Sequence, residues 1–76
     1  MSKATREKRE LLNSLDGQTV TLGIGTRIIV PRTGRVTANE DPFWVTFDDD
    51  GFLRAVPLAD IRWIEDSAGQ RVGGRW

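Results

Sequence analysis

The side chains that most often do chemistry at neutral pH are missing from this chain, which contains no cysteine and no histidine. It therefore has no thiolate nucleophile, no imidazole to move protons, and neither of the two commonest side-chain ligands for a transition metal. Ser14 and Ser67 have no histidine that could activate their hydroxyl groups. We expect a protein that is not an enzyme and that binds no cofactor.

Three adjacent carboxylates, Asp48 to Asp50, raise the hypothesis of a metal site. A calcium loop, however, places its acidic residues at alternate positions, with a central glycine and a distant glutamate. Adjacent aspartates on a turn cannot all point inward, and the Gly51 that follows them is typical of a tight turn. We therefore predict a hairpin at this point and no metal site.

Basic side chains are unevenly distributed along the chain, although its formal net charge is zero. The charge is +2 over residues 1–12, −4 over residues 13–66 and +2 over residues 67–76. Basic ends on an acidic body are typical of arms that contact nucleic acid or an acidic protein, and also of an ordinary mixed surface. In the N-terminal segment, the candidate phosphate contacts are Lys3, Arg6 and Arg9.

The densest basic cluster of the body comprises Arg27, Arg32 and Arg35. If the strand bends at Gly34, these side chains converge on one side and could bind a partner. If it does not, they are solvated arginines along an edge strand, where charge discourages aggregation. The sequence leaves both alternatives open.

Aromatic residues supply the other candidate partner-binding surface. From Phe43 to Phe47 the sequence alternates, so that Phe43, Val45 and Phe47 share one face while Trp44 and Thr46 share the other. Three apolar residues outweigh one, which predicts that Trp44 lies on the outer face. Trp44, together with the neighbouring Phe43, is a candidate binding platform, because a large aromatic side chain buries much area on contact. Alternatively, Trp44 packs under an N-terminal helix.

The elements that must position these residues follow from the periodicity of the chain. Residues 1–16 predict a helix that packs over an open end of a barrel, since Ser2 or Thr5 can cap it and its leucines fall on one side. Residues 17–66 contain five strand-like stretches separated by turn residues. The expected fold is mainly β, a small five-stranded antiparallel β-barrel with an N-terminal α-helix.

Details within the predicted barrel can also be tested. Gly23-Ile24-Gly25 predicts a bend or bulge that closes the barrel, because a phosphate loop would need a lysine and a following helix. Pro31 to Gly34 predicts a break in the second strand. Pro57 to Asp60 is short enough for a single helical turn, and Ile61 and Trp63 are expected to share the core face of the last strand.

Residues 67–76 show no regular spacing of apolar residues, which predicts a flexible basic tail. This tail ends in Trp76, behind a glycine spacer. The terminal tryptophan is either incidental or an anchor that enters a pocket on a neighbouring molecule. We retain it as a candidate partner-binding residue.

The rhythm of the predicted strands resembles that of known small barrels. The segments that carry the likeness are Gly25–Ile28, Gly34–Val36, Trp44–Asp49 and Val56–Ile61. They are similar to the strands of Src-homology-3-like and Tudor-like domains, in which a tight turn like Pro57–Asp60 precedes the last strand. With its leading helix, the chain also resembles the Sm-like barrels of RNA-binding rings.

The binding residues of those families are not reproduced here. Sm-like proteins read RNA with an aspartate and an asparagine between the second and third strands, where this chain has Glu40 and Trp44. Tudor-like domains use an aromatic cage, and this chain contains no tyrosine. The resemblance therefore implies a fold and no ligand.

Two functions fit these observations. The first, which we favour, is a non-enzymatic protein-interaction or assembly adaptor, compatible with a phage or plasmid origin, whose partner is a protein or a second copy of the chain. The alternative is a nucleic-acid-binding accessory or regulatory protein, in which basic residues contact RNA or DNA and Trp44 stacks on a base. The nine carboxylates between residues 13 and 66 argue against the alternative, because they repel a polyanion.

The expected location is the cytoplasm. No apolar run approaches the roughly 18 residues that a membrane-spanning helix needs, and the N-terminal segment is polar where a signal peptide would be hydrophobic. We therefore expect no membrane contact, and no small-molecule substrate is evident from the sequence.

Overall fold

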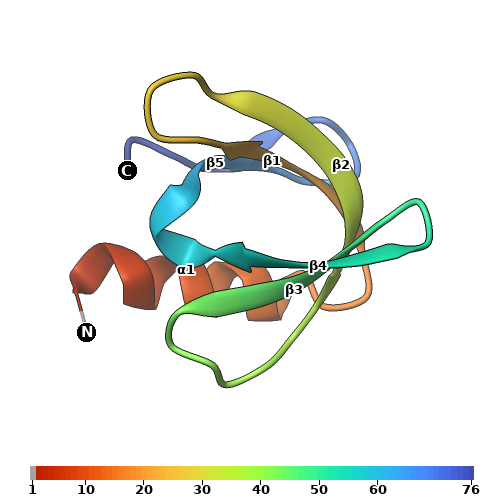
Figure 1. Cartoon of the computed structure of the whole chain (residues 1–76), viewed down its shortest axis with the longest axis horizontal. Coiled ribbons are helices and arrows are strands. Elements are labelled where there is room, and N and C mark those ends of the chain that lie inside the picture. Colours follow the sequence, from red (N-terminus) through yellow and green to blue (C-terminus); the bar gives the residue numbers. More distant parts are fainter. Residues whose placement is uncertain (1) are drawn as a thin grey trace.

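The computed structural model describes residues 2–76, which form one helix, one 3-10 turn and six strands (Figure 1). A mainly β domain with an N-terminal helix was expected and is confirmed. The expectation of a closed five-stranded barrel is wrong, because the sheet is open and its strand order is β4-β3-β2-β1-β5-β6. In chain order the elements are α1 (Lys3–Ser14), β1 (Thr19–Ile24), β2 (Val30–Thr37), β3 (Trp44–Asp49), β4 (Phe52–Pro57), η1 (Leu58–Asp60), β5 (Ile61–Glu65) and β6 (Arg71–Gly73).

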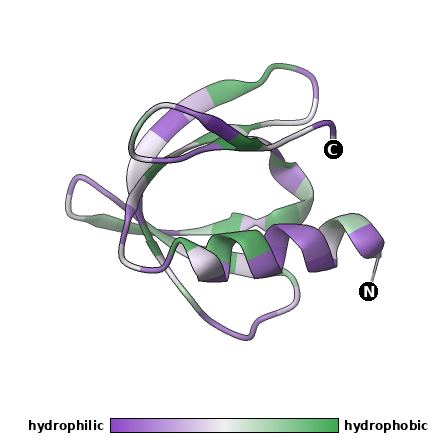
Figure 2. Cartoon of the chain, turned by 180° about the vertical axis from the view of Figure 1, so that it is seen from behind, coloured by the Kyte–Doolittle hydropathy of each residue, from purple (hydrophilic) through white to green (hydrophobic). Residues whose placement is uncertain are grey.

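Helix α1 begins and ends close to the positions that its capping residues predict. The Ser2 hydroxyl accepts the backbone N–H of Thr5 at 3.1 Å, and Gly17 takes a φ of +76° just beyond the last turn. The helix runs along one side of the curled sheet (Figure 2), where Leu12 is fully buried. No helix within residues 2–76 has the length and apolarity to cross a membrane.

The core is built by alternation along the strands. Val45 and Phe47 on β3 are fully buried, as the sequence predicts, but Phe43 is 70% exposed. The prediction for Phe43 is wrong because β3 begins only at Trp44, so the alternation does not reach back to it. The buried apolar residues are Leu12, Val20, Leu22, Val36, Val45, Phe47, Val56, Leu58, Ile61 and Ile64.

Strand β6 replaces the predicted flexible tail. Its residues pair antiparallel with β5, Ile64 opposite Gly73 and Glu65 opposite Arg71. A turn positions it, because the Asp66 carboxylate accepts the N–H groups of Ala68 and Gln70, both at 3.0 Å. The apolar pattern could not reveal this strand, since it is three residues long and Val72 is its one large apolar side chain.

Two glycines let the sheet curl tightly. Strand β2 continues through Pro31 to Gly34, where the sequence predicts a break, and a Cβ at Gly34 would overlap the backbone carbonyl of Asp48. An irregularity lies in the β1–β5 ladder beside Gly23 and Ile24, where one was expected, but the extra residue is Arg62 on β5, because Gly23 pairs with Trp63 and Ile24 with Ile61. It turns Ile64 into the core, so that Trp63 is half-buried over Gly23 rather than a core partner of Ile61.

The approach of Trp63 to Gly23 leads to a stability prediction. A Cβ at Gly23 would overlap the Trp63 indole, so Gly23→Ala should lower the free energy of unfolding by about 1 to 3 kcal/mol. Urea unfolding followed by circular dichroism would measure the change. In a Trp63→Ala background the added methyl group has room, and the loss should largely vanish. An equal loss in both backgrounds would contradict the proposed contact.

Candidate functional site

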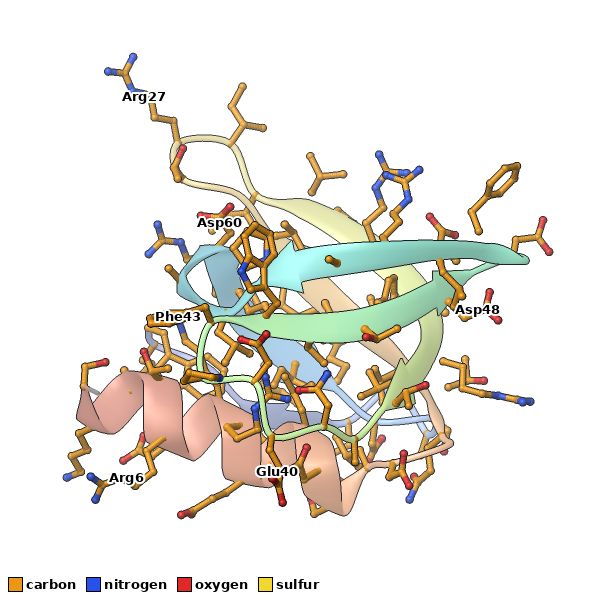
Figure 3. All side chains as sticks on the ribbon, turned by 60° about the horizontal axis from the view of Figure 1, so that its bottom comes forward. Arg6, Arg27, Glu40, Phe43, Asp48 and Asp60 are labelled. Atoms are coloured by element: carbon orange, nitrogen blue, oxygen red, sulfur yellow. The ribbon has the colours of Figure 1, made fainter. Side chains whose placement is uncertain are left out.

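The main candidate site is an apolar hollow of about 600 Å³ on the surface of the domain. It lies between the first turn of α1, the segment that leads into β3, and the end of β4 with the 3-10 turn. We call it the Trp44 groove, and its lining residues are Ser2, Thr5, Pro42, Phe43, Trp44, Pro57, Leu58 and Ala59. Figure 3 shows Phe43 at the end of this segment near α1. The sequence pointed to Trp44 as a surface platform, and Trp44 is 45% exposed in the groove wall.

The segment before β3 is held in a defined turn by its own aspartate. The Asp41 carboxylate accepts the backbone N–H groups of Phe43 at 2.8 Å and Trp44 at 3.2 Å. Trp44 then pairs with Pro57 across the β3–β4 ladder, so their side chains lie next to each other on the outer face. The N–H of Leu58 donates to the carbonyl of Phe43 at 2.8 Å, which joins the two walls of the groove.

Two buried, positively charged side chains of α1 donate hydrogen bonds to the backbone of both groove walls. Lys8 Nζ donates to the carbonyl of Leu58 at 2.8 Å, and Arg9 Nη2 donates to the carbonyls of Asp41 and Trp44. Both side chains are buried. The sequence made Arg9 a candidate phosphate contact together with Lys3 and Arg6, but the Arg9 side chain is buried and its guanidinium donates to the protein's own backbone.

Lys8 lies in a small cluster of charged and aromatic groups. Burial lowers the pKa of Lys8, the nearby Arg62 lowers it further, and Asp60 acts in the opposite direction. The Trp76 ring lies 5.4 Å from Lys8 Nζ, in a cation–π contact that favours the charged amine. Trp76, expected to reach a neighbouring molecule or to be incidental, packs in this structure against its own domain.

The basic residues expected to contact a partner are not brought together. Along β2, Arg32 lies opposite the buried Leu22, whereas Arg35 lies three residues further on, opposite Thr19 and Asp48. An odd spacing on a strand puts the two arginines on opposite faces. The hypothesis that Arg27, Arg32 and Arg35 converge is therefore wrong.

The remaining basic candidates are also spread over the surface. Arg27 lies in the exposed loop between β1 and β2, while Lys3 and Arg6 lie on the exposed side of α1. Figure 3 shows Arg27 and Arg6 projecting from distant parts of the domain in different directions. These side chains do not form a stripe that could follow a phosphate backbone.

The aspartates before Gly51 form the predicted hairpin. Asp48 accepts the N–H of Gly51 at 2.8 Å, Asp49 pairs with Arg54 at 3.6 Å, and Asp50 and Gly51 take φ values of +53° and +89°. These positive values match the tight two-residue turn that the sequence indicates. In the part of the chain that the structure describes, no group of three histidine, cysteine or acidic residues could hold a metal ion.

Several residues of the site escaped the sequence patterns. The sequence predicts Pro57 only as part of a turn and makes no candidate of Lys8 or Arg54, yet Pro57 and Arg54 line hollows, and Lys8 donates to the carbonyl of Leu58 in a groove wall. Pro57 could have been found from its neighbours, since the even hairpin around Asp50-Gly51 sets it opposite Trp44.

The chain matches no protein-family model, no curated protein and no solved structure. The resemblance to Src-homology-3-like, Tudor-like and Sm-like barrels is thus supported only at the level of a small antiparallel β domain with an N-terminal helix. A functional proposal has to rest on the groove and its surroundings.

The buried Arg9 leads to a second prediction. Arg9→Met removes the donor to two backbone carbonyls, and we expect the free energy of unfolding to fall by about 2 to 4 kcal/mol. The amide protons of Phe43 and Trp44 should also exchange faster with solvent. The control is Arg6→Met at an exposed position, which should change stability by less than about 0.5 kcal/mol. Similar behaviour of the two variants would show that Arg9 does not hold the groove wall.

A third prediction concerns pH. Because the pKa of Lys8 is lower in the folded chain than its unfolded value of about 10.4, the unfolded state binds more protons between these two values. Stability should therefore rise as the pH increases through this interval and be lowest below the folded pKa. The chain has no tyrosine and no cysteine, so few other groups titrate there.

Urea unfolding between pH 8 and about pH 11 would measure this effect. The rise should disappear in Lys8→Met and persist in Lys3→Met, since Lys3 is exposed. A stability that stays flat or falls with pH in the unmodified chain would contradict the inferred cost of burying the Lys8 charge.

Proposed function

We propose that this chain is a non-enzymatic adaptor whose Trp44 groove binds an extended, proline-containing segment of a partner protein. The observation that carries the proposal is the pair of neighbouring aromatic side chains, Phe43 and Trp44, which stay 70% and 45% exposed although the backbone beneath them is firmly held. An exposed aromatic pair on a fixed backbone loses little conformational entropy on binding, which favours affinity.

The chemistry of the groove favours a polyproline II segment over a β-strand. A strand binds mainly through backbone hydrogen bonds, and the groove offers few free polar groups for them. The Ser2 and Thr5 hydroxyls lie 2.8 Å apart and hydrogen-bond to each other, and the Ser2 hydroxyl also caps α1 by accepting the Thr5 N–H. The carbonyl of Phe43 already accepts the Leu58 N–H. Proline rings need no such partners and pack on flat aromatic and proline surfaces such as Trp44 and Pro57.

The nucleic-acid alternative finds less support in this geometry. It needs the basic residues on one surface, while Arg9 is buried and Arg32 and Arg35 lie on opposite faces of β2. The charge of the body, −4 over residues 13–66, also opposes binding to a polyanion.

The test uses acetylated, amidated decaproline as the probe and a Gly-Ser decapeptide as the control peptide. Titration of isotope-labelled protein should shift the indole N–H signal of Trp44 more than those of Trp63 and Trp76. Trp44→Ala should weaken binding about 30-fold, the effect of removing about 2 kcal/mol of central contact. Phe52→Ala is the matched control, because Phe52 is 72% exposed at the β3–β4 hairpin, outside the groove.

Two outcomes would overturn the proposal. One is the absence of decaproline binding, or binding that Trp44→Ala leaves unchanged in a folded protein. The other is binding of a mixed-sequence oligonucleotide that weakens steeply between about 50 and 200 mM salt, since that dependence is typical of phosphate contacts. The second result would favour the nucleic-acid alternative.

A further inference from the structure

A second hollow, of about 340 Å³, adjoins the Trp44 groove. The two share Pro57, which lines both. We call the second one the arginine hollow, and its lining residues are Ile24, Val30, Arg32, Phe47, Arg54, Ala55, Val56 and Pro57. Strand β4 is at the edge of the sheet, so a segment that lies in the groove and continues past Pro57 can cross this edge and enter the arginine hollow.

The two arginines reach this hollow from strands that are not neighbours. Arg32 lies on β2 and Arg54 on β4, with β3 between them. Their ladder partners are the fully buried Leu22 and Phe47, so both arginines lie on the concave face of the sheet. The curl of the open sheet brings the two strands to one apolar hollow, at whose floor Phe47 lies.

The charge of the hollow is poorly compensated. Among residues 2–76, Arg32 makes no ion pair within 4.0 Å, and Arg54 pairs only with Asp49, at 3.6 Å, with the Arg54 side chain 54% exposed. A single, partly exposed pair of this length contributes little, and the exposed part of the Arg54 guanidinium can also accept a second carboxylate. Residues 13–66 are otherwise acidic, so the two guanidinium groups beside the apolar lining of the hollow form a site that favours an anion.

We propose that the arginine hollow is the acidic subsite of the peptide interface. In this assignment the partner segment carries an aspartate or glutamate next to its proline-containing stretch. The carboxylate pairs with Arg32 and Arg54, whose planar groups suit carboxylate oxygens. This inference rests on the proposed function, because the Trp44 groove supplies the contact that brings the segment into place.

The test compares matched peptides. Each has a core of seven prolines, acetylated and amidated, extended at one end or the other by Gly-Glu-Gly or by Gly-Gln-Gly. In the extension that enters the hollow, the glutamate peptide should bind about three- to fivefold more tightly than the glutamine peptide at 50 mM salt. The difference should shrink at 500 mM salt, because salt screens exposed ion pairs.

Variants assign the preference to the two arginines. Arg32→Gln and Arg54→Gln should each reduce the ratio between the affinities for the glutamate and the glutamine peptide, and together they should abolish this preference. The control is Arg35→Gln, which makes the same change in net charge on the opposite face of β2. All three side chains are exposed, so folding should be unaffected, and circular dichroism would verify this.

The outcomes separate this inference from the proposed function. Equal binding of glutamate and glutamine peptides at both ends, with decaproline binding retained, overturns the acidic subsite and leaves the groove proposal standing. A glutamate preference that survives in the double variant, or that Arg35→Gln removes equally, also overturns it. Failure of every proline peptide to bind overturns the groove proposal itself.

Discussion

The structure depends on two cationic side chains that α1 carries into the interior of the domain. Removing a charge from water costs several kcal/mol unless hydrogen bonds replace the lost solvation. Lys8 and Arg9 obtain theirs from the backbone carbonyls of Leu58, Asp41 and Trp44, which belong to the two walls of the groove. The helix can be buried only where those carbonyls are available, so the position of the helix and the shape of the groove are fixed together.

The same arrangement explains why the aromatic residues remain outside. Nε and Nη1 of Arg9 are buried without a partner among residues 2–76, so the local hydrogen bonding is already incomplete. If the loop shifted so that Phe43 or Trp44 became buried, Arg9 would lose its hydrogen bonds to the carbonyls of Asp41 and Trp44. The exposed aromatic pair is thus held in place by polar contacts beneath it, while apolar packing of core residues such as Phe47 and Leu12 stabilises the sheet on its other side.

The elements with strong local signals could be predicted from the sequence, and the ones set by distant contacts could not. Capping at Ser2, alternation in β3 and the turn at Asp50-Gly51 each depend on a few neighbouring residues. The burial of Arg9 depends on carbonyls more than 30 residues away. Arg32 and Arg54 line one hollow only because the sheet curls far enough to bring β2 near β4. Strand β6 forms because it can pair with the edge of β5. Local periodicity carries no information on these three.

Ser2 caps α1 and also lines the Trp44 groove, so the start of the helix is part of the binding surface. A bulky polypeptide fused ahead of Ser2 is attached at the edge of the Trp44 groove and hinders access to the groove. The opposite end of the chain, at Trp76, does not line the groove. Affinity tags and fused reporters consequently belong at the C-terminus, and an N-terminal fusion acts as a tethered competitor whose removal by a protease exposes the surface.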